Sequence, residues 1–392
     1  MNVLKPFYYD KFECIGEKCK DSCCLGWNVF IDKKTFNQYK KISGPFKKEL
    51  NDGVSRNRKD SNELHYGKIN LEQGRCKFLN DRNLCDIYIN LGENYLCNTC
   101  KQYPRLLYKF GEVYEKTLNL SCPEVARILV ETNEIFSFDM NNEILNETEK
   151  QYIQKYNYNK DLYNLLWEGR SLSIEVAQFR EIDIWKRLVF IKIIEERLQE
   201  NIENKKYDNV SYIIEECRQM ATSYERISSL DNLEKVTEVK IQFISILLRR
   251  KINERESNKT FLGLMEQFEQ LTNNIEKFNQ LEEEFNSYFE KYEYVLESYI
   301  VYSLYNNYMK ALVNEDLNKC ILILILSYST IKILLMARWK SNNKNLSNDD
   351  IVDVLYSFSR VTEHNNVFMQ DLYDDLKNEG YISLAYLTIL VR

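Results

Sequence analysis

The sequence predicts a mainly α protein in which a loop-rich, cysteine-rich metal-binding domain, residues 1–122, is followed by an all-helical domain, residues 123–392. Nine of the eleven cysteines lie in the first 122 residues. All four prolines and eight of the eleven glycines lie in the first 123 residues, and both residue types interrupt regular structure. The remaining sequence contains no proline and shows apolar residues at helical spacing, which favours long helices.

Composition and charge restrict the class of protein. The chain has 392 residues, 44% hydrophobic and 29% charged, as is typical of a soluble globular protein. A formal net charge of −6 argues against a broad nucleic-acid-binding surface, which needs a basic excess. The first residues, MNVLKPFYYDKFEC, show no basic segment followed by an apolar stretch, so we expect no secretory signal and a cytoplasmic location. Crowded thiols in a reducing compartment favour metal binding over disulfides.

The N-terminal cysteines fall into groups whose spacing suits metal ligation. The first group is Cys14, Cys19 and the adjacent pair Cys23 and Cys24. The others are Cys76 with Cys85, Cys97 with Cys100 in a C-x2-C motif, and Cys122. Thiolate is a soft ligand that suits zinc, cuprous copper and iron–sulfur clusters. Neighbouring side chains diverge, so Cys23 and Cys24 are not expected to bind one ion. One cluster, a cluster plus zinc, or several inert cysteines all remain open.

The predicted boundary between the two domains carries the pattern of a helix start. Ser121 and Glu124 are spaced as a capping box, and Pro123 is tolerated in the first turn. Cys122 therefore lies at a helix N-terminus, where exposed N–H groups favour a thiolate.

The rest of the sequence is interpreted as a series of helices. We expect them near residues 150–167, 172–200, 208–226, 231–255, 260–310, 315–340, 348–363, 366–378 and 382–391. In residues 260–310, apolar residues alternate at spacings of three and four, which is typical of a long helix packed along a neighbour, with at most one break.

Residues 320–339, CILILILSYSTIKILLMARW, approach the length of a membrane-spanning helix. Ser327, Ser329, Thr330 and Lys332 lie in the middle of this segment. A charge at the centre of a bilayer is costly, so we expect a helix buried in the protein and no membrane association.

Four segments of the sequence carry a resemblance to a known family. They are FECIGEKCKDSCCLGWNVFID, GRCKFLNDRNLCDIY, LCNTCKQYPR and NLSCPEVARIL. In cysteine order and intervening residues they resemble the flagellin lysine N-methylase family, part of a broader group of zinc- or iron-chelating proteins with a CxxCxxCC-type signature. The resemblance is dense over residues 7–130 and continues weakly into SFSRVTEHN at 357–365.

The resemblance implies methyl transfer from S-adenosylmethionine to lysine side chains of flagellin, with a 4Fe-4S iron–sulfur cluster in the cysteine-rich domain. Zinc is the alternative metal. The ligands that it implies are Cys14, Cys19, Cys23, Cys24, Cys76, Cys85, Cys100 and Cys122. Cys97 fits the family pattern least well.

Two common arrangements for binding S-adenosylmethionine are missing. No G-x-G-x-x-G loop is present, and a Cys-x3-Cys-x2-Cys motif starting at Cys19 would need cysteine where the chain has Gly26. The methyl donor would then bind by an unusual route, and the sequence assigns neither catalytic nor donor-binding residues. Simpler structural roles are expected for the polar and aromatic residues considered, which are Trp27, Asp86, Tyr103, Arg105, Glu124 and His364.

Two further hypotheses compete with the methylase. The first is a non-catalytic zinc- or iron-binding protein whose helical domain binds a partner protein. The second is a redox sensor based on a cluster, and the acidic balance disfavours a DNA-binding version of it. The oligomeric state is left undetermined.

Overall fold

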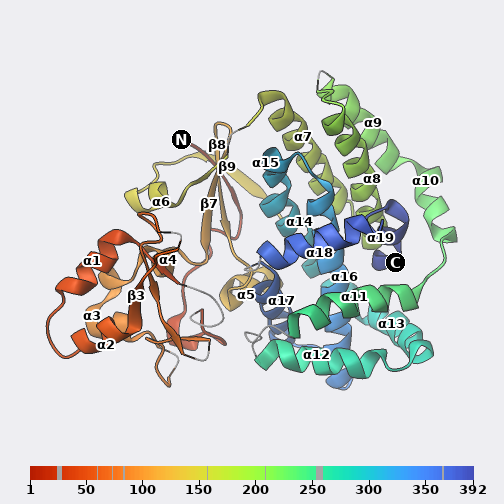
Figure 1. The fold of residues 1–392 in the computed structure, drawn as a ribbon. Coiled ribbons are helices and arrows are strands. Elements are labelled where there is room, and N and C mark those ends of the chain that lie inside the picture. The colour runs from red at the N-terminus through yellow and green to blue at the C-terminus, as the bar shows by residue number, and fades with distance from the viewer. Residues whose placement is uncertain are drawn as a thin grey trace.

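The structure is a computed structural model that describes residues 1–23, 29–59, 61–72, 74–82, 84–156, 158–207, 209–252, 259–363 and 366–392. Figure 1 shows a smaller part made of short strands and short helices beside a larger helical part. Helices hold most of the described residues, so the predicted mainly α fold class is confirmed.

A five-stranded sheet lies between these parts. Its strands are β1 (Asn2–Pro6), β7 (Arg105–Phe110), β8 (Val113–Leu118), β9 (Phe138–Asn142) and β10 (Gln154–Lys155), in the order β10-β7-β8-β1-β9. β7 and β8 form an antiparallel hairpin, and β1 pairs with β8 in parallel and with β9 in antiparallel fashion. Gly111 has φ 57° in the hairpin turn, a conformation that glycine adopts without strain.

β9 and β10 correct the expectation that every element after residue 122 is helical. β9 has the sequence FDMNN and is exposed along most of its length. Its apolar and polar residues alternate only from Phe138 to Asn141, a run at the lower limit for recognising a half-buried strand. β10 contains only two residues, Gln154 and Lys155, both exposed.

The cysteine-rich part consists of short elements around a small core of its own. They are η1 (Gly16–Lys18), β2 (Phe30–Ile31), α1 (Lys33–Lys41), α2 (Lys47–Gly53), β3 (Val54–Arg56), β4 (Gly67–Ile69), β5 (Leu71–Glu72), β6 (Arg75–Cys76), α3 (Asp86–Leu91), η2 (Glu93–Tyr95) and α4 (Asn98–Gln102). Ile31, Leu50 and Phe78 are buried in this core together with Cys76 and Cys97. Two thiols are thus buried among the apolar side chains of the smaller part.

The larger part packs its helices around one continuous core. They are α5 (Pro123–Glu131), α7 (Lys160–Ala177), α8 (Ile184–Glu203), α9 (Val210–Thr222), α10 (Tyr224–Ser229), η3 (Leu230–Asn232), α11 (Thr237–Ile252), α12 (Lys259–Thr272), α13 (Ile275–Phe289), η4 (Glu290–Tyr292), α14 (Glu293–Asn307), η5 (Tyr308–Lys310), α15 (Ala311–Asn314), α16 (Asn318–Ser341), α17 (Asn348–Glu363), α18 (Asn366–Asn378) and α19 (Leu384–Val391). α6 (Glu147–Tyr152) lies instead on the other side of the sheet (Figure 1), where Gln151 accepts a hydrogen bond from Asn98 of α4.

Four expected helices are divided differently in the structure, and one of them, segment 208–226, is split between α9 and α10. The segment 260–310 forms α12, α13 and α14, so it breaks twice. Asn274 starts α13 by accepting a hydrogen bond from the Lys277 N–H, which satisfies a free donor at the new helix end. Segment 172–200 is divided between α7 and α8, and segment 150–167 between α6, β10 and α7, whose N-cap is Asn159.

The start of α5 also differs from the predicted capping box. Cys122 is the N-cap residue, and no side chain caps this helix end. The Ser121 hydroxyl instead donates to Asn119 Oδ1 at 2.6 Å and lies 2.9 Å from the Tyr103 hydroxyl. Glu124 binds Arg127 within the same helix.

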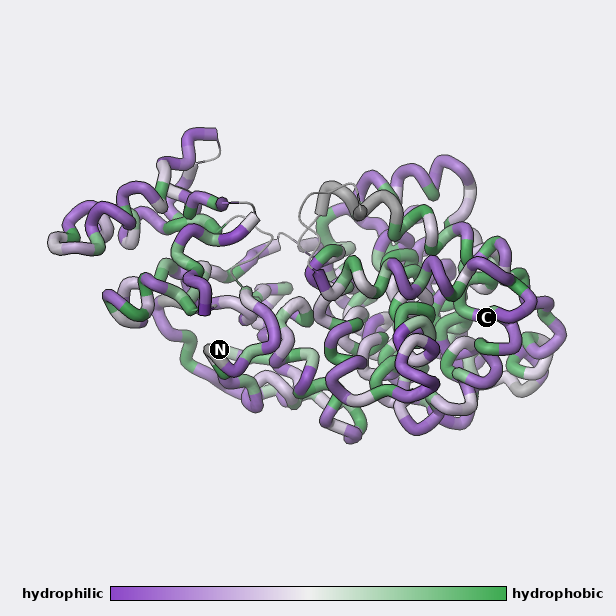
Figure 2. Tube along the Cα trace, turned by 90° about the horizontal axis from the view of Figure 1, so that it is seen from below, coloured by the Kyte–Doolittle hydropathy of each residue, from purple (hydrophilic) through white to green (hydrophobic). Residues whose placement is uncertain are grey.

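α16 is the central helix of the larger part. Its most apolar window has a mean hydropathy of 2.2, and 89% of that window is buried inside the protein. Lys332 is buried near Glu282, and burial lowers the pKa of Lys332 to about 8. The prediction of a protein-buried helix is therefore confirmed. Figure 2 shows hydrophobic residues concentrated in the middle of this part and hydrophilic ones along the outermost helices of the smaller part.

A buried ion pair joins the sheet to the helical part. Arg170 of α7 donates to both carboxylate oxygens of Glu115 on β8, at 2.7 and 2.8 Å, and both side chains are at most 3% exposed. The Tyr305 hydroxyl adds a hydrogen bond to the Leu4 carbonyl at 3.0 Å. The sheet is thus fixed directly to α7 and α14.

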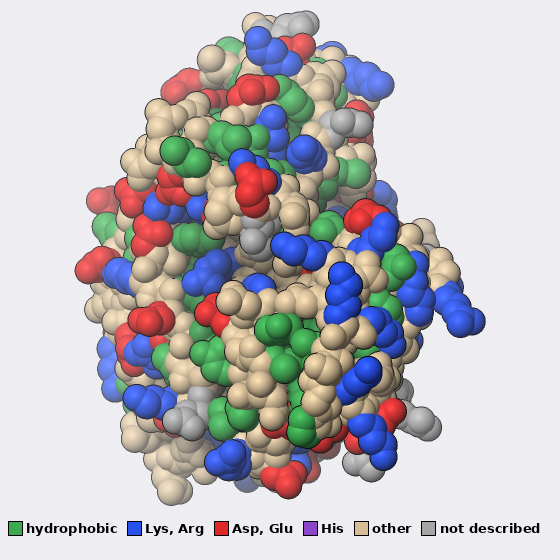
Figure 3. All heavy atoms as spheres, turned by 90° about the vertical axis from the view of Figure 1, so that its left-hand side faces the viewer, with side chains coloured by type: hydrophobic (Ala, Val, Ile, Leu, Met, Phe, Trp, Pro, Cys, Tyr) green, Lys and Arg blue, Asp and Glu red, His purple; other side chains and the backbone are tan. Residues whose placement is uncertain are grey.

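Figure 3 shows the face of the molecule formed by the left-hand side of Figure 1. Side chains of both charge signs are interspersed there, with lysine and arginine more frequent along the right-hand edge of the view. Hydrophobic side chains gather near the centre of the same face. The described residues of this face are therefore mixed in charge.

Candidate functional site

Four of the predicted metal ligands gather near the start of α5. Cys14, Cys19 and Cys23 lie in the loop before β2, and Cys122 is the N-cap residue of α5. The charges of Cys14 and Cys23 act on Cys19, and those of Cys19 and Cys23 act on Cys122, so the thiols lie near one another. We call these four the loop thiols. Cys24 lies outside the described residues.

Burial, not the helix end, dominates the protonation of Cys122. Burial raises the pKa of the Cys122 thiol to about 12, although the backbone N–H groups of Val125 and Glu124 act in the opposite direction. The expected thiolate is therefore disfavoured, because the loss of hydration destabilises the charged form more than the N–H groups at the helix start stabilise it. A bound metal ion would reverse this balance, since it takes the thiol as thiolate.

The other predicted ligands lie in the small core, around Tyr39. Cys97 and Cys100 have their sulfur atoms 3.5 Å apart at the start of α4, and this contact lowers the pKa of Cys97. The charges of Cys85, Cys97 and Cys100 all act on Tyr39, and Cys76 is buried in the same core. We call Cys76, Cys85, Cys97 and Cys100 the core thiols. Cys97, which fits the family pattern least well, is thus placed directly against Cys100.

In the described part of the chain, the thiols lie near one another but do not form a complete metal-binding group. Among the residues that the structure describes, no three histidine, cysteine, aspartate or glutamate side chains form a metal-binding group. Ligation by thiolates alone is chemically suited to a soft metal or an iron–sulfur cluster. The metal-ligand assignment of these cysteines accordingly stays a prediction.

Ion pairs fix the loop of Cys19 and Cys23 to helix α17. Asp21 accepts a hydrogen bond from Arg360 at 2.7 Å, and the Lys20 ammonium lies 2.9 Å from a carboxylate oxygen of Asp353. Arg360 also donates to the Ser121 carbonyl at 3.3 Å. One helix of the larger part therefore holds both the cysteine loop and the segment that leads to Cys122.

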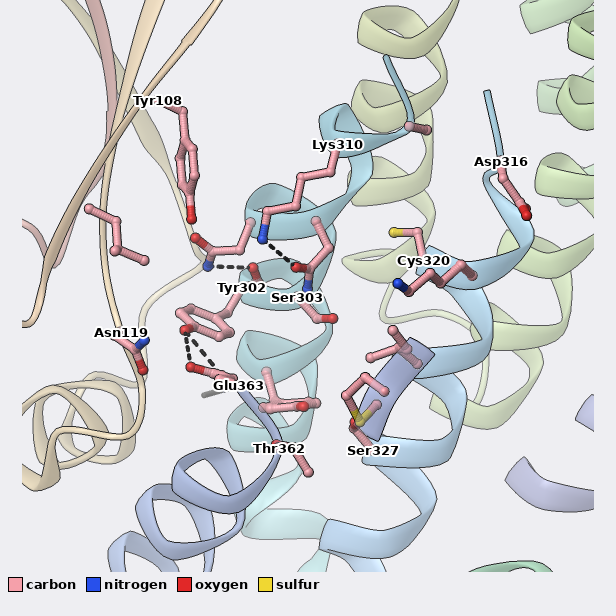
Figure 4. Close-up of a pocket in the computed structure, with 18 of the residues that line it drawn as sticks. Tyr108, Asn119, Tyr302, Ser303, Lys310, Asp316, Cys320, Ser327, Thr362 and Glu363 are labelled. Atoms are coloured by element: carbon pink, nitrogen blue, oxygen red, sulfur yellow. Dashed lines mark hydrogen bonds between the residues drawn. The ribbon is translucent and has the colours of Figure 1, made fainter. Parts of the chain in front are cut away.

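The same helix ends in a cavity of about 260 Å³. Its lining comes from β7, α14, η5, α15, α16, α17 and α18, with Asn119 from the segment before α5 and Asp316 from the segment before α16. Figure 4 shows Tyr108, Lys310, Tyr302 and Glu363 arranged along one side of this space. We call it the Glu363 cavity.

Glu363 is the acidic centre of the cavity. The Tyr302 hydroxyl lies 3.2 Å from each of its carboxylate oxygens and also accepts a hydrogen bond from the Leu120 N–H at 3.0 Å (Figure 4). Burial raises the pKa of Glu363 to about 7, while the Tyr302 hydrogen bond and the charge of Lys310 act in the opposite direction. This carboxyl group can therefore take up and release a proton near neutral pH.

Aromatic rings surround the acidic group. The rings of Tyr299 and Tyr302 have their centroids 6.3 Å apart, and both residues line the cavity together with Tyr108. Burial raises the pKa of Tyr299 and of Tyr302, so both remain neutral phenols. Neutral aromatic faces beside a carboxylate attract organic cations such as ammonium or sulfonium groups.

Lys310 supplies the opposite charge. Its ammonium donates to Asn307 Oδ1 at 2.9 Å and lies 5.4 Å from the centroid of the Tyr108 ring. Over the described part of the chain, no carboxylate lies within ion-pair distance of Lys310. Burial lowers the pKa of Lys310, because the ammonium has lost water without gaining an anion.

The cavity and the loop thiols lie on either side of one short segment. Asn119 lines the cavity, and the Leu120 N–H binds Tyr302. Ser121 binds Tyr103, and Cys122 follows with its thiol among the loop thiols. Four consecutive residues thus connect the two candidate sites.

Sequence reasoning did not find the cavity. Tyr299 lies in the apolar pattern predicted for residues 260–310, and Glu363 lies in SFSRVTEHN, the segment that carries the weak part of the family resemblance. Trp27 and His364 lie outside the described residues. The other side chains considered have structural contacts: Asp86 with Asn80, Tyr103 with Ser121, Arg105 over the Phe12 ring, and Glu124 with Arg127.

Comparison with known proteins places the chain in a family. Residues 170–390, more than half of the chain, match the family model described as FliB lysine N-methylase C-terminal domain. The chain belongs to this family. The family resemblance predicted from the sequence is confirmed. Lys310 and Glu363 lie inside the matched residues, and the cysteine-rich part lies outside them.

Individual relatives match over a shorter stretch. A lysine-N-methylase of Salmonella typhimurium and the flagellar biosynthetic protein FliU of Salmonella muenchen are each 32% identical to the chain over 133 residues, 33% of its length. This stretch is 33% of the lysine-N-methylase and 78% of FliU, so the chain spans about a third of the length of the first relative. No solved structure matches the chain.

Proposed function

We propose that this protein transfers a methyl group from S-adenosylmethionine to lysine side chains of a flagellar protein, with flagellin as the main substrate. The reaction is assigned to the Glu363 cavity, and the protein is expected to act in the cytoplasm. The observation that carries the proposal is a carboxyl group with a pKa of about 7, held by Tyr302 in an aromatic cavity inside the family-matched residues. The family membership and the names of the relatives support it.

The chemistry requires a base. A lysine side chain has an ordinary pKa of about 10.4, so its ammonium must lose a proton before its nitrogen can attack. Ionised Glu363 attracts the ammonium, and the tyrosine rings stabilise the same positive charge. Glu363 then accepts the proton, which a group with pKa near the working pH does most effectively.

The bond changes balance with this single proton acceptor. The lysine nitrogen uses its lone pair to form a bond to the methyl carbon. The bond between that carbon and the sulfonium sulfur breaks, and its electron pair stays on the sulfur. The products are a methylated lysine, a neutral thioether and a proton held on Glu363. Exclusion of water from the cavity would strengthen each of these electrostatic effects.

The thiols are proposed to hold a metal centre, as an iron–sulfur cluster or, alternatively, as zinc. When bound, such a centre supplies cross-links to the loop-rich part, and a cluster can also carry an electron. The loop thiols are linked to the Glu363 cavity through the segment from Asn119, which lines the cavity, to Cys122. Iron, sulfide and zinc analysis of anaerobically purified protein would separate the two alternatives.

The function is tested by incubating the purified protein with S-adenosylmethionine and flagellin and mapping methylated lysines by mass spectrometry. We expect methyl groups on lysine side chains and none when the protein is left out. Absence of methylated lysine from a folded, metal-loaded preparation would overturn the proposal. That outcome would favour a metal-binding protein whose helical part binds a partner.

A further inference from the structure

The Glu363 cavity carries two opposite charges that do not neutralise each other. Lys310 and Glu363 both line it, and each charge acts on the other without forming an ion pair in the described structure. In Figure 4 the Lys310 side chain extends toward the strand that carries Tyr108, while Glu363 lies next to Tyr302. A partly buried cation and a partly buried anion that do not pair with each other are each destabilising unless a ligand of opposite charge binds to them.

The other charged groups that line the cavity already have partners. Asp316 accepts a hydrogen bond from the Tyr373 hydroxyl at 2.5 Å and lies 3.4 Å from the Lys377 ammonium. The Lys319 ammonium donates to the neutral side-chain oxygen of Gln370, and the charges of two carboxylates, Asp374 and Asp316, act on it. Among the described residues, Lys310 contacts the neutral amide of Asn307 and the Tyr108 ring, and Glu363 is the one carboxylate whose charge acts on it. The anion that enters this cavity is therefore expected at Lys310.

A further polar atom is available in the lining. Asn306 is 8% exposed, and its Oδ1 has no hydrogen-bond partner among the described residues, whereas its Nδ2 donates to the Tyr302 carbonyl at 2.9 Å. A buried acceptor without a donor costs free energy, which a ligand N–H would recover. The cavity thus offers one cation, one anion and one acceptor, together with aromatic faces.

We infer that the Glu363 cavity binds an α-amino acid zwitterion, with its carboxylate at Lys310 and its cationic groups toward Asn306, Glu363 and the tyrosine rings. This inference rests on the proposed function, in which the methionine end of the methyl donor is such a zwitterion with a sulfonium attached. A lysine side chain within a protein substrate brings only a cation and would leave Lys310 without an anion. The carboxylate of the methyl donor, and not the target lysine, therefore explains why the cavity has a cation at Lys310.

Binding measurements test the role of Lys310. The probes are S-adenosylhomocysteine, which carries the amino-acid end, and 5′-methylthioadenosine, which lacks it. Calorimetry would compare the natural protein with Lys310→Met. Loss of a charge-assisted contact should weaken the affinity for S-adenosylhomocysteine by about tenfold to hundredfold and leave the affinity for 5′-methylthioadenosine unchanged.

Controls separate this effect from damage to the fold. Lys340→Met removes an exposed lysine from α16 and should leave the affinities for both probes unchanged. Lys310→Arg keeps the charge and should restore part of the affinity for S-adenosylhomocysteine. If Lys310→Met does not fold, Lys310→Gln supplies the same comparison with a polar side chain.

The outcomes distinguish the inference from the proposed function. Equal affinity of Lys310→Met and natural protein for S-adenosylhomocysteine would overturn the inference, and lysine methylation by the natural protein would still uphold the function. The inference is also overturned if neither S-adenosylhomocysteine nor L-methionine binds the natural protein. Lys310-dependent binding of L-methionine without any methyl transfer would uphold the inference and sink the proposed function.

Discussion

The cysteine-rich part and the helical part differ in what fills their cores. In the helical part, long helices bury continuous hydrocarbon, as at Leu334 of α16, which is fully buried. In the cysteine-rich part, short elements surround a small core that includes Cys76 and Cys97. A large hydrocarbon core can stabilise itself, whereas a small loop-rich one commonly depends on cross-links. The difference indicates that one part supplies a rigid cavity and the other part depends on what its thiols bind.

The buried ion pair between the sheet and the helical part is the first contact whose removal tests the comparison. Glu115→Gln removes the charge that Arg170 binds, and Arg170 would remain buried and unpaired. We expect the free energy of unfolding to fall by about 3–5 kcal/mol. The measurement is chemical denaturation followed by circular dichroism.

An exposed pair provides the matched control for that loss. Glu175 binds Arg218 on the surface, with side chains 59% and 41% exposed. Glu175→Gln should change the free energy of unfolding by about 0–1 kcal/mol. If Glu115→Gln cost no more than this control, the sheet would not be fixed to the helical part by the buried pair.

Equivalent truncations in the two cores sharpen the comparison. Leu334→Ala should destabilise the helical part by about 2–5 kcal/mol, because it leaves a cavity among packed helices. Leu50→Ala, at a residue 1% exposed in the small core, should open only the cysteine-rich part. Hydrogen exchange resolved by peptide measures both effects. Global loss of protection in Leu50→Ala would show that the two cores unfold as one.

Metal removal addresses the same difference without a mutation. If the thiols hold a metal, a chelator should speed amide exchange in β2, β4 and α4 and leave α14 and α16 protected. Equal protection with and without the chelator, in a preparation shown to have lost its metal, would mean that the small core stabilises itself.

A smaller effect is expected where the cysteine loop meets α17. Asp21→Asn weakens the contact to Arg360, whose two side chains are 15% and 9% exposed. The loss should be about 1 kcal/mol and confined to exchange in residues 14–23. Glu134→Gln, at a 4.0 Å contact with Lys11 on the surface, should have no measurable effect. Similar exchange in both variants would indicate that the loop is held by other contacts.

The sequence predicted the features that depend on local pattern. Turn residues and cysteines marked the loop-rich part, and the apolar run around Lys332 gave the buried helix α16. It did not predict β9, because the alternation of apolar and polar residues in this strand spans only Phe138 to Asn141. The sequence predicted too few breaks in residues 260–310, because the break at Asn274 depends on a single side-chain hydrogen bond that caps α13.

The candidate site was mostly beyond sequence reasoning. Tyr108, Asn119, Tyr302, Lys310 and Glu363 come from separate elements, and no spacing motif links them. Only the tertiary fold brings them together, and only burial gives Glu363 its raised pKa. The cysteine pattern, in contrast, is a local signal, and it pointed to a part of the molecule that adjoins the cavity without lining it.

The most direct test of the account is the pH dependence of methyl transfer to flagellin by the natural protein, Glu363→Gln and Glu195→Gln. Burial raises the pKa of both glutamates to about 7, but only Glu363 lines the cavity. A base works when ionised, so the natural rate should rise with pH through about 7.

In Glu363→Gln the rate should no longer rise with pH and should be lower by a factor of about 10²–10⁴, whereas Glu195→Gln should keep the natural pH profile. Melting curves of the three proteins would confirm that each is folded. If Glu363→Gln kept the natural rate and pH profile, the cavity would not be the place of reaction, and the central claim would be wrong.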